Sequence, residues 1–172
     1  MPNWISGSLK VRGKPENVKK FFMEGLNKYK GEVNSKTGKY ETHVVPKDTW
    51  LKTDINDPKV DEFYFDILNS EWIYVEDTRR AFITGEHYIY AWLHEDDGLL
   101  YVVSDINQAW SFDPEDWMSV SAKYRIDMRL WGLECGMCFG QEIEVHDGEL
   151  VLNKSFDYDN WTWEAPIPWL GG

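Results

Sequence analysis

Alternation of apolar and polar side chains in short segments constrains the fold of this chain more than any other sequence feature. In residues 4–12, WISGSLKVR, the apolar Ile5, Leu9 and Val11 alternate with polar side chains, and residues 124–131, YRIDMRLW, alternate in the same way. A period of two is typical of a β-strand with one buried face, because successive side chains point to opposite sides. The sequence therefore predicts strands that each carry one apolar and one polar face.

Two segments have the signals of helices instead. Residues 14–31, KPENVKKFFMEGLNKYKG, place Pro15 in a first turn and end on glycine, and residues 111–124 offer Asp113 as N-cap and Pro114 as first helical residue. The first segment also carries an apolar stripe at helical spacing, made of Val18, Phe22, Leu26 and Tyr29. We expect both helices to pack on a sheet through such stripes.

Two hairpins complete the expected elements. EHYIYAWL and LLYVVSDI, residues 86–93 and 99–106, flank HEDDG, while FGQEIEV and ELVLNK, residues 139–145 and 149–154, flank HDG. The resulting order predicts an α+β fold with a ferredoxin-like split βαβ core: a four-stranded antiparallel sheet, two helices on one of its faces, and an added C-terminal β-hairpin. We expect one domain over residues 1–172, with an irregular insertion at about 32–70 and an acidic, aromatic tail at 155–172.

Three stretches are similar to a known family. They are MPNW with the following strand that ends in KVRG, INQAWSFDPEDW at residues 106–117, and CGMCFGQEIEVHDGEL at residues 135–150. Together they resemble the YubB-type ferredoxin-like family of bacterial plasmid and phage proteins, over most of the chain outside roughly residues 32–70. The resemblance implies a ferredoxin-like fold and a mobile genetic element as the source. It implies no catalytic residues, and Ile5 and Phe112–Asp113 depart from the family's usual pattern.

The charge of the chain is strongly negative and unevenly distributed. The net charge is −12; residues 1–39 hold nine Lys/Arg and three Asp/Glu, a balance of +6, and residues 40–172 hold nine and 27, a balance of −18. Binding to a phosphate backbone needs many cations, so we expect no direct nucleic-acid partner. An acidic face favours a basic protein partner instead. No long uncharged apolar segment or signal-like start occurs, so we expect no membrane contact and a cytoplasmic location.

The sequence contains no clear catalytic or metal-binding motif. An N-terminal Pro2 could act as a base near neutral pH, but Asn3 and Trp4 follow it, and we interpret it as structural. Cys135 and Cys138 form a single Cys-x-x-Cys pair in a glycine-rich turn, without the second pair or the spaced histidines that a zinc site needs. We therefore predict no catalytic residue, no cofactor and no metal, and the sequence favours a non-enzymatic protein over an enzyme.

The chain is rich in aromatic residues, with ten Trp, nine Tyr and eight Phe. Two groups of residues form the candidate interaction surface: Tyr88, Tyr90 and Trp92 on one predicted strand, and Asp157, Asp159, Trp161, Trp163 and Glu164 in the tail. The tail either packs its tryptophans over the free sheet face or offers them to a partner, because tryptophan is a common interface anchor.

Two functions follow from these alternatives. The first is an accessory protein that binds another, basic, protein through an acidic aromatic surface. The second is a small-molecule or nucleotide-binding module, or a minor enzyme, that uses the free sheet face. A contiguous acidic patch would favour the first, and a concave aromatic pocket with convergent polar groups would favour the second.

Overall fold

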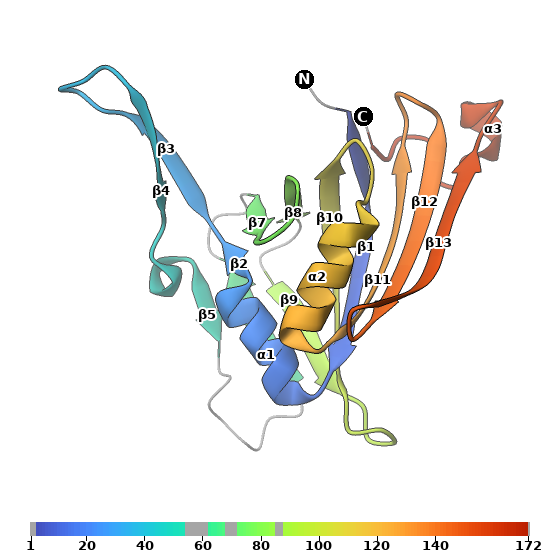
Figure 1. Ribbon diagram of the computed structural model, residues 1–172, viewed down its shortest axis with the longest axis horizontal. Coiled ribbons are helices and arrows are strands. Elements are labelled where there is room, and N and C mark those ends of the chain that lie inside the picture. The colour runs from blue at the N-terminus through green and yellow to red at the C-terminus, as the bar shows by residue number, and fades with distance from the viewer. Residues whose placement is uncertain (1–2, 54–61, 68–71, 85–87, 172) are drawn as a thin grey trace.

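The protein, in a computed structural model, is built around one large antiparallel sheet (Figure 1). The structure describes residues 3–53, 62–67, 72–84 and 88–171. Within them the helices are α1 (Pro15–Glu24), α2 (Pro114–Tyr124), α3 (Trp161–Glu164) and a 3-10 turn, η1 (Lys47–Thr49). The strands are β1 (Trp4–Gly13), β2 (Leu26–Asn27), β3 (Tyr29–Val33), β4 (Tyr40–Val44), β5 (Leu51–Thr53), β6 (Glu62–Ile67), β7 (Ile73–Val75), β8 (Ala81–Thr84), β9 (Tyr88–Leu93), β10 (Leu100–Ala109), β11 (Asp127–Glu134), β12 (Phe139–His146) and β13 (Glu149–Asp157).

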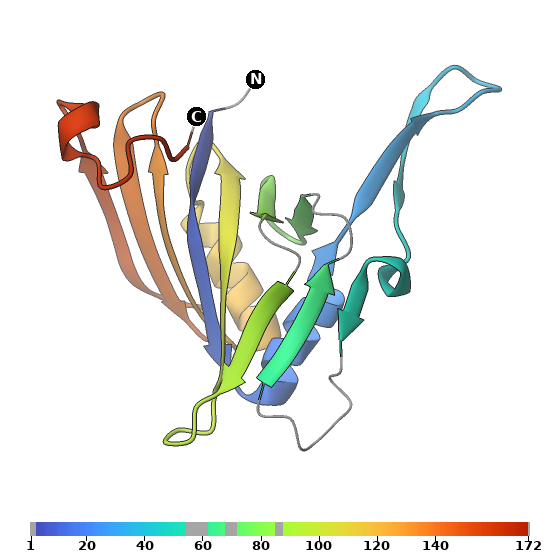
Figure 2. The ribbon, with the colours of Figure 1, turned by 180° about the vertical axis from the view of Figure 1, so that it is seen from behind.

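The large sheet branches at β10. Its main path runs β13-β12-β11-β1-β10-β8-β7-β2. One edge of β10 pairs with β1 along its whole length, whereas the other edge pairs with β9 at residues 100–102 and with β8 at residues 105–108. From β9 the sheet continues to β6 and β5. Beyond β10 the sheet therefore divides into two wings, which Figure 2 shows from behind.

The predicted ferredoxin-like fold, with its four-stranded sheet, is wrong, because the large sheet has eleven strands among the described residues. The additional strands come mainly from short segments without a clear period. Residues 32–70, expected to be irregular, contain β4, β5, β6 and the end of β3, and β3 pairs with β4 as a separate two-stranded hairpin. All residues of β3 are exposed and four of the five in β4 are too. A strand without a buried face does not need apolar residues at alternate positions, so the sequence pattern does not reveal it.

The first helix is shorter than its apolar stripe predicts. It ends at Glu24, where Gly25 donates its backbone N–H to the Phe21 carbonyl at 2.7 Å. Leu26 is buried as the stripe predicts, but it reaches the core from β2, where it pairs with Val75. The chain then runs on into β3, and Tyr29 is exposed. Burial of position 26 does not distinguish a helix from a strand, and pairing with β7 decides between them.

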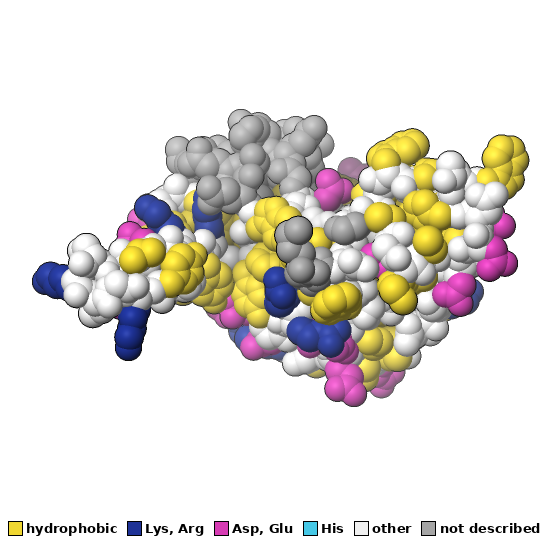
Figure 3. Space-filling model, turned by 90° about the horizontal axis from the view of Figure 1, so that it is seen from above, with side chains coloured by type: hydrophobic (Ala, Val, Ile, Leu, Met, Phe, Trp, Pro, Cys, Tyr) yellow, Lys and Arg dark blue, Asp and Glu magenta, His cyan; other side chains and the backbone are white. Residues whose placement is uncertain are grey.

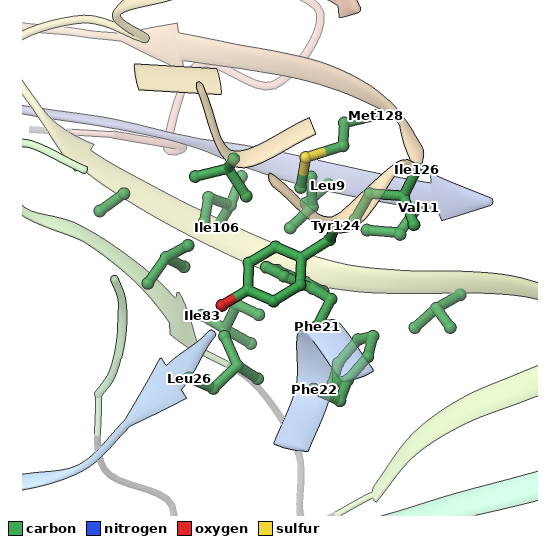
Figure 4. Close-up of a cluster of buried hydrophobic side chains, with 14 of the residues drawn as sticks. Leu9, Val11, Phe21, Phe22, Leu26, Ile83, Ile106, Tyr124, Ile126 and Met128 are labelled. Atoms are coloured by element: carbon green, nitrogen blue, oxygen red, sulfur yellow. The ribbon is translucent and has the colours of Figure 1, made fainter. Parts of the chain in front are cut away.

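The core lies between the sheet and the two longer helices, which cover the same face (Figures 1 and 2). Side chains from β1, α1 and the junction of α2 with β11 meet there (Figure 4). Leu9 of β1, Phe21 and Phe22 of α1, and Tyr124 at the end of α2 are all buried. The rings of Phe21 and Tyr124 meet edge to face with centroids 5.4 Å apart. This cluster joins elements that are more than a hundred residues apart in the sequence.

The start of α2 forms as predicted and is fixed to the sheet by a buried glutamine. The Asp113 carboxylate accepts the Glu115 N–H at 3.1 Å, which caps the helix. Gln108 of β10 is fully buried; its Oε1 accepts the Trp117 Nε1–H and its Nε2 donates to Asp116, both at 2.9 Å. A buried amide needs such partners, so Gln108 sets where the helix lies against β10.

Two glycines allow β1 and β11 to come together. Gly7 pairs with Gly132, and a Cβ on Gly7 would lie 1.8 Å from the Trp131 carbonyl oxygen. No side chain fits at that distance, so position 7 requires glycine for the central pairing of the sheet.

Candidate functional site

The face of the sheet away from α1 and α2 carries the polar side chains of the alternating strands, and we call it the open face. Strand register places the following residues on it: Ser6, Ser8, Lys10 and Arg12 of β1, Tyr101, Val103, Asp105 and Asn107 of β10, Asp127, Arg129 and Trp131 of β11, and Glu142, Glu144 and His146 of β12. The same alternation buries Leu9 and Val11 on the opposite face. The open face is thus a direct product of the pattern that builds the core.

Charged side chains pair with one another across the open face, both between strands and within β12. The Arg12 Nε donates to Asp127 Oδ2 at 2.9 Å, from β1 to the facing residue of β11. Arg129 bonds Glu142 and also lies 3.7 Å from Glu144. The His146 Nε2 is 2.7 Å from Glu144 Oε1. These pairs link three neighbouring strands.

Two open hollows lie side by side on this face. One, of about 160 Å³, is lined by Lys10, Arg12, Tyr101, Asp127, Arg129, Glu144 and His146, together with Val11 and Met128. The other, of about 350 Å³, is lined by Ser8, Lys10, Arg129, Trp131 and Glu142. Lys10 and Arg129 belong to both. Tyr101 donates its hydroxyl to Asp97 at 2.8 Å, and this hydrogen bond raises the pKa of Tyr101, which keeps the phenol neutral.

At the other end of the open face the side chains are aromatic. Trp4 meets Trp72 edge to face at 4.8 Å and Phe82 at 5.9 Å, and Phe82 in turn contacts Tyr74 at 5.6 Å. The Arg80 guanidinium lies 5.4 Å from the Trp4 ring centroid. These rings pack mainly on one another. They cover the open face from β1 to the β7–β8 wing.

A polar contact fixes the base of the β3–β4 hairpin next to this aromatic cluster. The Tyr29 hydroxyl donates to Glu76 Oε1 at 2.6 Å, and the Asn27 amide donates to the same oxygen at 2.7 Å. The hydrogen bond to the carboxylate, more than burial, raises the pKa of Tyr29 to about 12. Tyr29 therefore stays protonated as a donor well above neutral pH.

Residues 158–171, which we call the tail loop, form a second candidate surface. The loop is attached at both ends to the turn between β11 and β12: the Tyr158 N–H donates to the Cys138 carbonyl at 2.9 Å, and the Cys135 thiol donates to the Gly171 carbonyl at 3.2 Å. Gly171 has a φ of +88°, and a Cβ there would lie 2.3 Å from a backbone oxygen of β11. Within the loop, the Trp161 indole donates to the Pro168 carbonyl at 2.8 Å. The ends of the loop are thus fixed by one backbone hydrogen bond and one hydrogen bond from a cysteine thiol.

The outer side of the tail loop is acidic and aromatic. Trp163 is 86% exposed and Trp169 is 84% exposed. The acidic Asp157, Asp159 and Glu164 beside them are exposed as well. In Figure 3, hydrophobic side chains project at the upper right of the view and acidic side chains lie lower on the same side, which is the α3 side of the molecule. Two tryptophans with so little cover on one short loop mark it as a candidate interaction surface.

The structure separates the two groups of predicted interaction residues. Asp157, Trp163 and their neighbours belong to one stretch of chain from the end of β13 through α3, in which Trp161 is half-buried against Tyr158, with ring centroids 5.6 Å apart. Trp92 stacks with Tyr101 at 6.2 Å, and four strands of the sheet path separate its strand, β9, from β13. Tyr88 and Tyr90 are also in β9, but their side chains lie outside the described part of the chain. The predicted residues therefore belong to two surfaces.

Sequence reasoning missed Trp169 and the charged residues of the open face. Trp169 lies in the same acidic, aromatic tail, and that composition was the signal for it. Lys10, Arg12 and Arg129 occur in the two alternating segments, so their shared face was predictable from each segment alone. Their neighbours across the strands were not, because pairing joins segments about 115 residues apart.

The remaining candidates have structural surroundings. Cys135 and Cys138 anchor the tail loop, and the described residues contain no group of three or more His, Cys, Asp or Glu side chains placed to hold a metal ion. Pro2 lies outside the described residues. Among the helices that the structure describes, none is long and apolar enough to cross a membrane.

Comparison of the chain with protein-family models, with curated proteins and with solved structures gives no match in any of the three. The resemblance to YubB-type proteins therefore stays a prediction. Function has to be argued from the two surfaces alone.

Proposed function

We propose that this protein acts by binding a basic protein through the acidic, aromatic outer side of the tail loop. The observation that carries the proposal is the exposure of Trp163 and Trp169 on a loop fixed at both ends. Burying a large apolar side chain contributes about 1.5–3 kcal/mol, and tryptophans are frequent centres of binding energy in interfaces.

The attachment of the loop also supports this proposal. A segment already held in one conformation loses little conformational entropy when it binds, so more of the contact energy is available as affinity. The Tyr158–Cys138 backbone hydrogen bond, the hydrogen bond from the Cys135 thiol to Gly171 and the Trp161–Pro168 hydrogen bond hold the loop in this way.

Charge favours a basic partner over other proteins. Asp157, Asp159 and Glu164 are exposed in the same stretch of chain as Trp163, and the chain as a whole has a charge of −12. Complementary charge accelerates association and rejects acidic partners. The same proposal includes a role as an accessory protein of a phage or plasmid, which rests on the sequence resemblance. It also includes a cytoplasmic location, a non-enzymatic role and no direct binding of nucleic acid, which rest on the composition, charge and motifs of the sequence.

The test is affinity capture from bacterial lysate with four immobilised proteins: wild type, Trp163→Ala/Trp169→Ala, a charge-reversed variant (Asp157, Asp159 and Glu164 to Lys), and Trp92→Ala. Trp92 is a matched control, because it is a partly exposed tryptophan on a different surface. We expect a basic protein that wild type and Trp92→Ala enrich equally and that both tail variants lose. With the purified partner, the double tryptophan variant should raise Kd at least about thirtyfold, and added salt should weaken wild-type binding.

Two results would contradict the proposal. One is a set of captured proteins that is the same for wild type and the double tryptophan variant. The other is a partner lost equally with Trp92→Ala, which would place the interface on the sheet. Thermal melting of each variant checks that the fold is intact, which the exposure of the changed side chains leads us to expect.

A further inference from the structure

Lys10 on the open face differs from Arg12 and Arg129 beside it, which each form an ion pair with a carboxylate. Lys10 of β1 faces Arg129 of β11 directly in the strand register, and its neighbour on β10 is Val103. Like charges directly opposite each other destabilise a sheet. Arg129 is compensated by Glu142 and Glu144, whereas Lys10 takes part in none of the ion pairs formed by the described residues. An anion bound at Lys10 would remove this repulsion.

A second cation lies two residues further along the same strand. Arg12 shares the open face with Lys10, and both line the smaller hollow. Its hydrogen bond to Asp127 is made through Nε, so the two terminal nitrogens of the guanidinium are not committed to that carboxylate. Guanidinium and ammonium groups together are the usual donors to a phosphate.

The larger hollow adds an aromatic wall next to Lys10. Trp131 is half-buried on the open face and lines this hollow with Ser8 and Glu142. An indole that is packed on one side offers its other side for stacking with a planar ring, and bases of every kind stack on such rings. Ser8 and Glu142 supply a hydroxyl and carboxylate oxygens for the polar edge of the same ligand.

We propose that the open face binds a nucleoside monophosphate, with the phosphate at Lys10 and Arg12 and the base stacked on Trp131. One phosphate fits the charge count better than several, because Arg129, the third Lys or Arg side chain that lines the hollows, is already paired with Glu142 and Glu144. A nucleic-acid strand would bring further phosphates against Asp127, Glu142 and Glu144, whose charges repel them. This site is separate from the tail loop, so either proposal can fail without the other.

The experiment follows the amide resonances of the ¹⁵N-labelled protein by NMR during titration with AMP, CMP, GMP and UMP. Isothermal titration calorimetry then gives the Kd. The variants are Lys10→Ala, Trp131→Leu and, as a matched control, Lys20→Ala, which removes an exposed lysine from α1 on the other side of the sheet. We expect at least one mononucleotide to shift amide resonances of β1 and β11. Lys10→Ala and Trp131→Leu should each raise Kd at least about tenfold, and Lys20→Ala should change it less than twofold.

Further arms separate the parts of the ligand and its sources. Inorganic phosphate and the free nucleoside should each bind at least about tenfold more weakly than the mononucleotide, since each makes only one of the two contacts. Equal binding of inorganic phosphate would overturn the role of Trp131. An eight-residue oligonucleotide that binds more than about a hundredfold tighter than the mononucleotide would overturn the proposal in favour of a nucleic-acid strand. No shift with any mononucleotide at millimolar concentration, in a protein whose fold is intact, would overturn it outright.

Discussion

The two faces of the central sheet use the same strands for opposite purposes. On the covered face, Leu9 and Val11 pack against α1 and α2 and are almost fully buried. On the open face, Lys10 and Arg12 of the same strand meet solvent and the charged side chains of β11. Apolar burial stabilises the fold, whereas exposed ion pairs contribute little to stability. The covered face therefore holds the structure together, and the open face is free to carry specificity.

The comparison predicts the largest effect for a change on the covered face. Leu9→Ala leaves a cavity among Phe21, Tyr124 and Met128, and it should lower the free energy of unfolding by about 3 kcal/mol. The next residue, Lys10, points to the open face. Lys10→Ala should change the free energy of unfolding by less than about 0.5 kcal/mol. Urea denaturation followed by circular dichroism measures both. Similar losses for the two variants would show that the faces do not differ in this way.

A smaller loss is expected where the covered face receives its second helix. Asp113→Ala removes the N-cap of α2 and should cost about 1 kcal/mol of unfolding free energy. Asp113→Asn keeps an oxygen that can accept the Glu115 N–H, so it should retain most of the stability. If alanine and asparagine variants unfold at the same urea concentration, the cap does not stabilise the helix.

On the open face, breaking an ion pair should have less effect still. Asp127→Asn removes the partner of Arg12, whose side chain is 40% exposed, and should cost less than about 1 kcal/mol. Because solvent screens this pair, the difference from wild type should shrink further in 1 M NaCl. A loss above about 2 kcal/mol that persists in salt would mean that the open face contributes to stability as the core does.

The smallest effect concerns a single proton at the edge of the open face. Glu76→Gln removes the charged acceptor of the Tyr29 hydroxyl, so the pKa of Tyr29 should fall from about 12 towards the ordinary value near 10. The folded-state pKa is the raised one, so this hydrogen bond stabilises the protein below pH 10, and its contribution is lost as the pH rises towards 12.

Absorbance titration at alkaline pH, taken as the difference between each protein and its Tyr29→Phe variant, isolates this one phenol. The prediction is wrong if the difference curve of wild type already has its midpoint near pH 10. A midpoint that Glu76→Gln leaves unchanged would assign the raised pKa to burial instead.

Several elements of the fold could be predicted from local patterns. The alternation in residues 4–12 identifies β1 and its buried face, Asp113 and Pro114 mark the start of α2, and the HDG turn places the hairpin of β12 and β13. The acidic, aromatic character of the tail was also visible. Each of these depends on neighbours within a few residues, which the sequence displays directly.

The eleven-stranded sheet could not be predicted in the same way. The short strands β5 and β8 have three and four residues, too few to show a period, and β3 and β4 have no buried face. The early end of α1 also depended on pairing, since Leu26 is buried whether it lies in a helix or in a strand beside Val75.

The sequence by itself determined which side chains alternate, where α2 begins and which turns close the hairpins, because these follow from local backbone geometry. Only the tertiary structure decided that β10 branches, that Lys10 faces Arg129, and that the tail loop is attached at both ends to the Cys135–Cys138 turn. Those features arise from contacts between segments distant in the sequence. Such contacts are selected by the packing and charge of the whole molecule, which no local pattern contains.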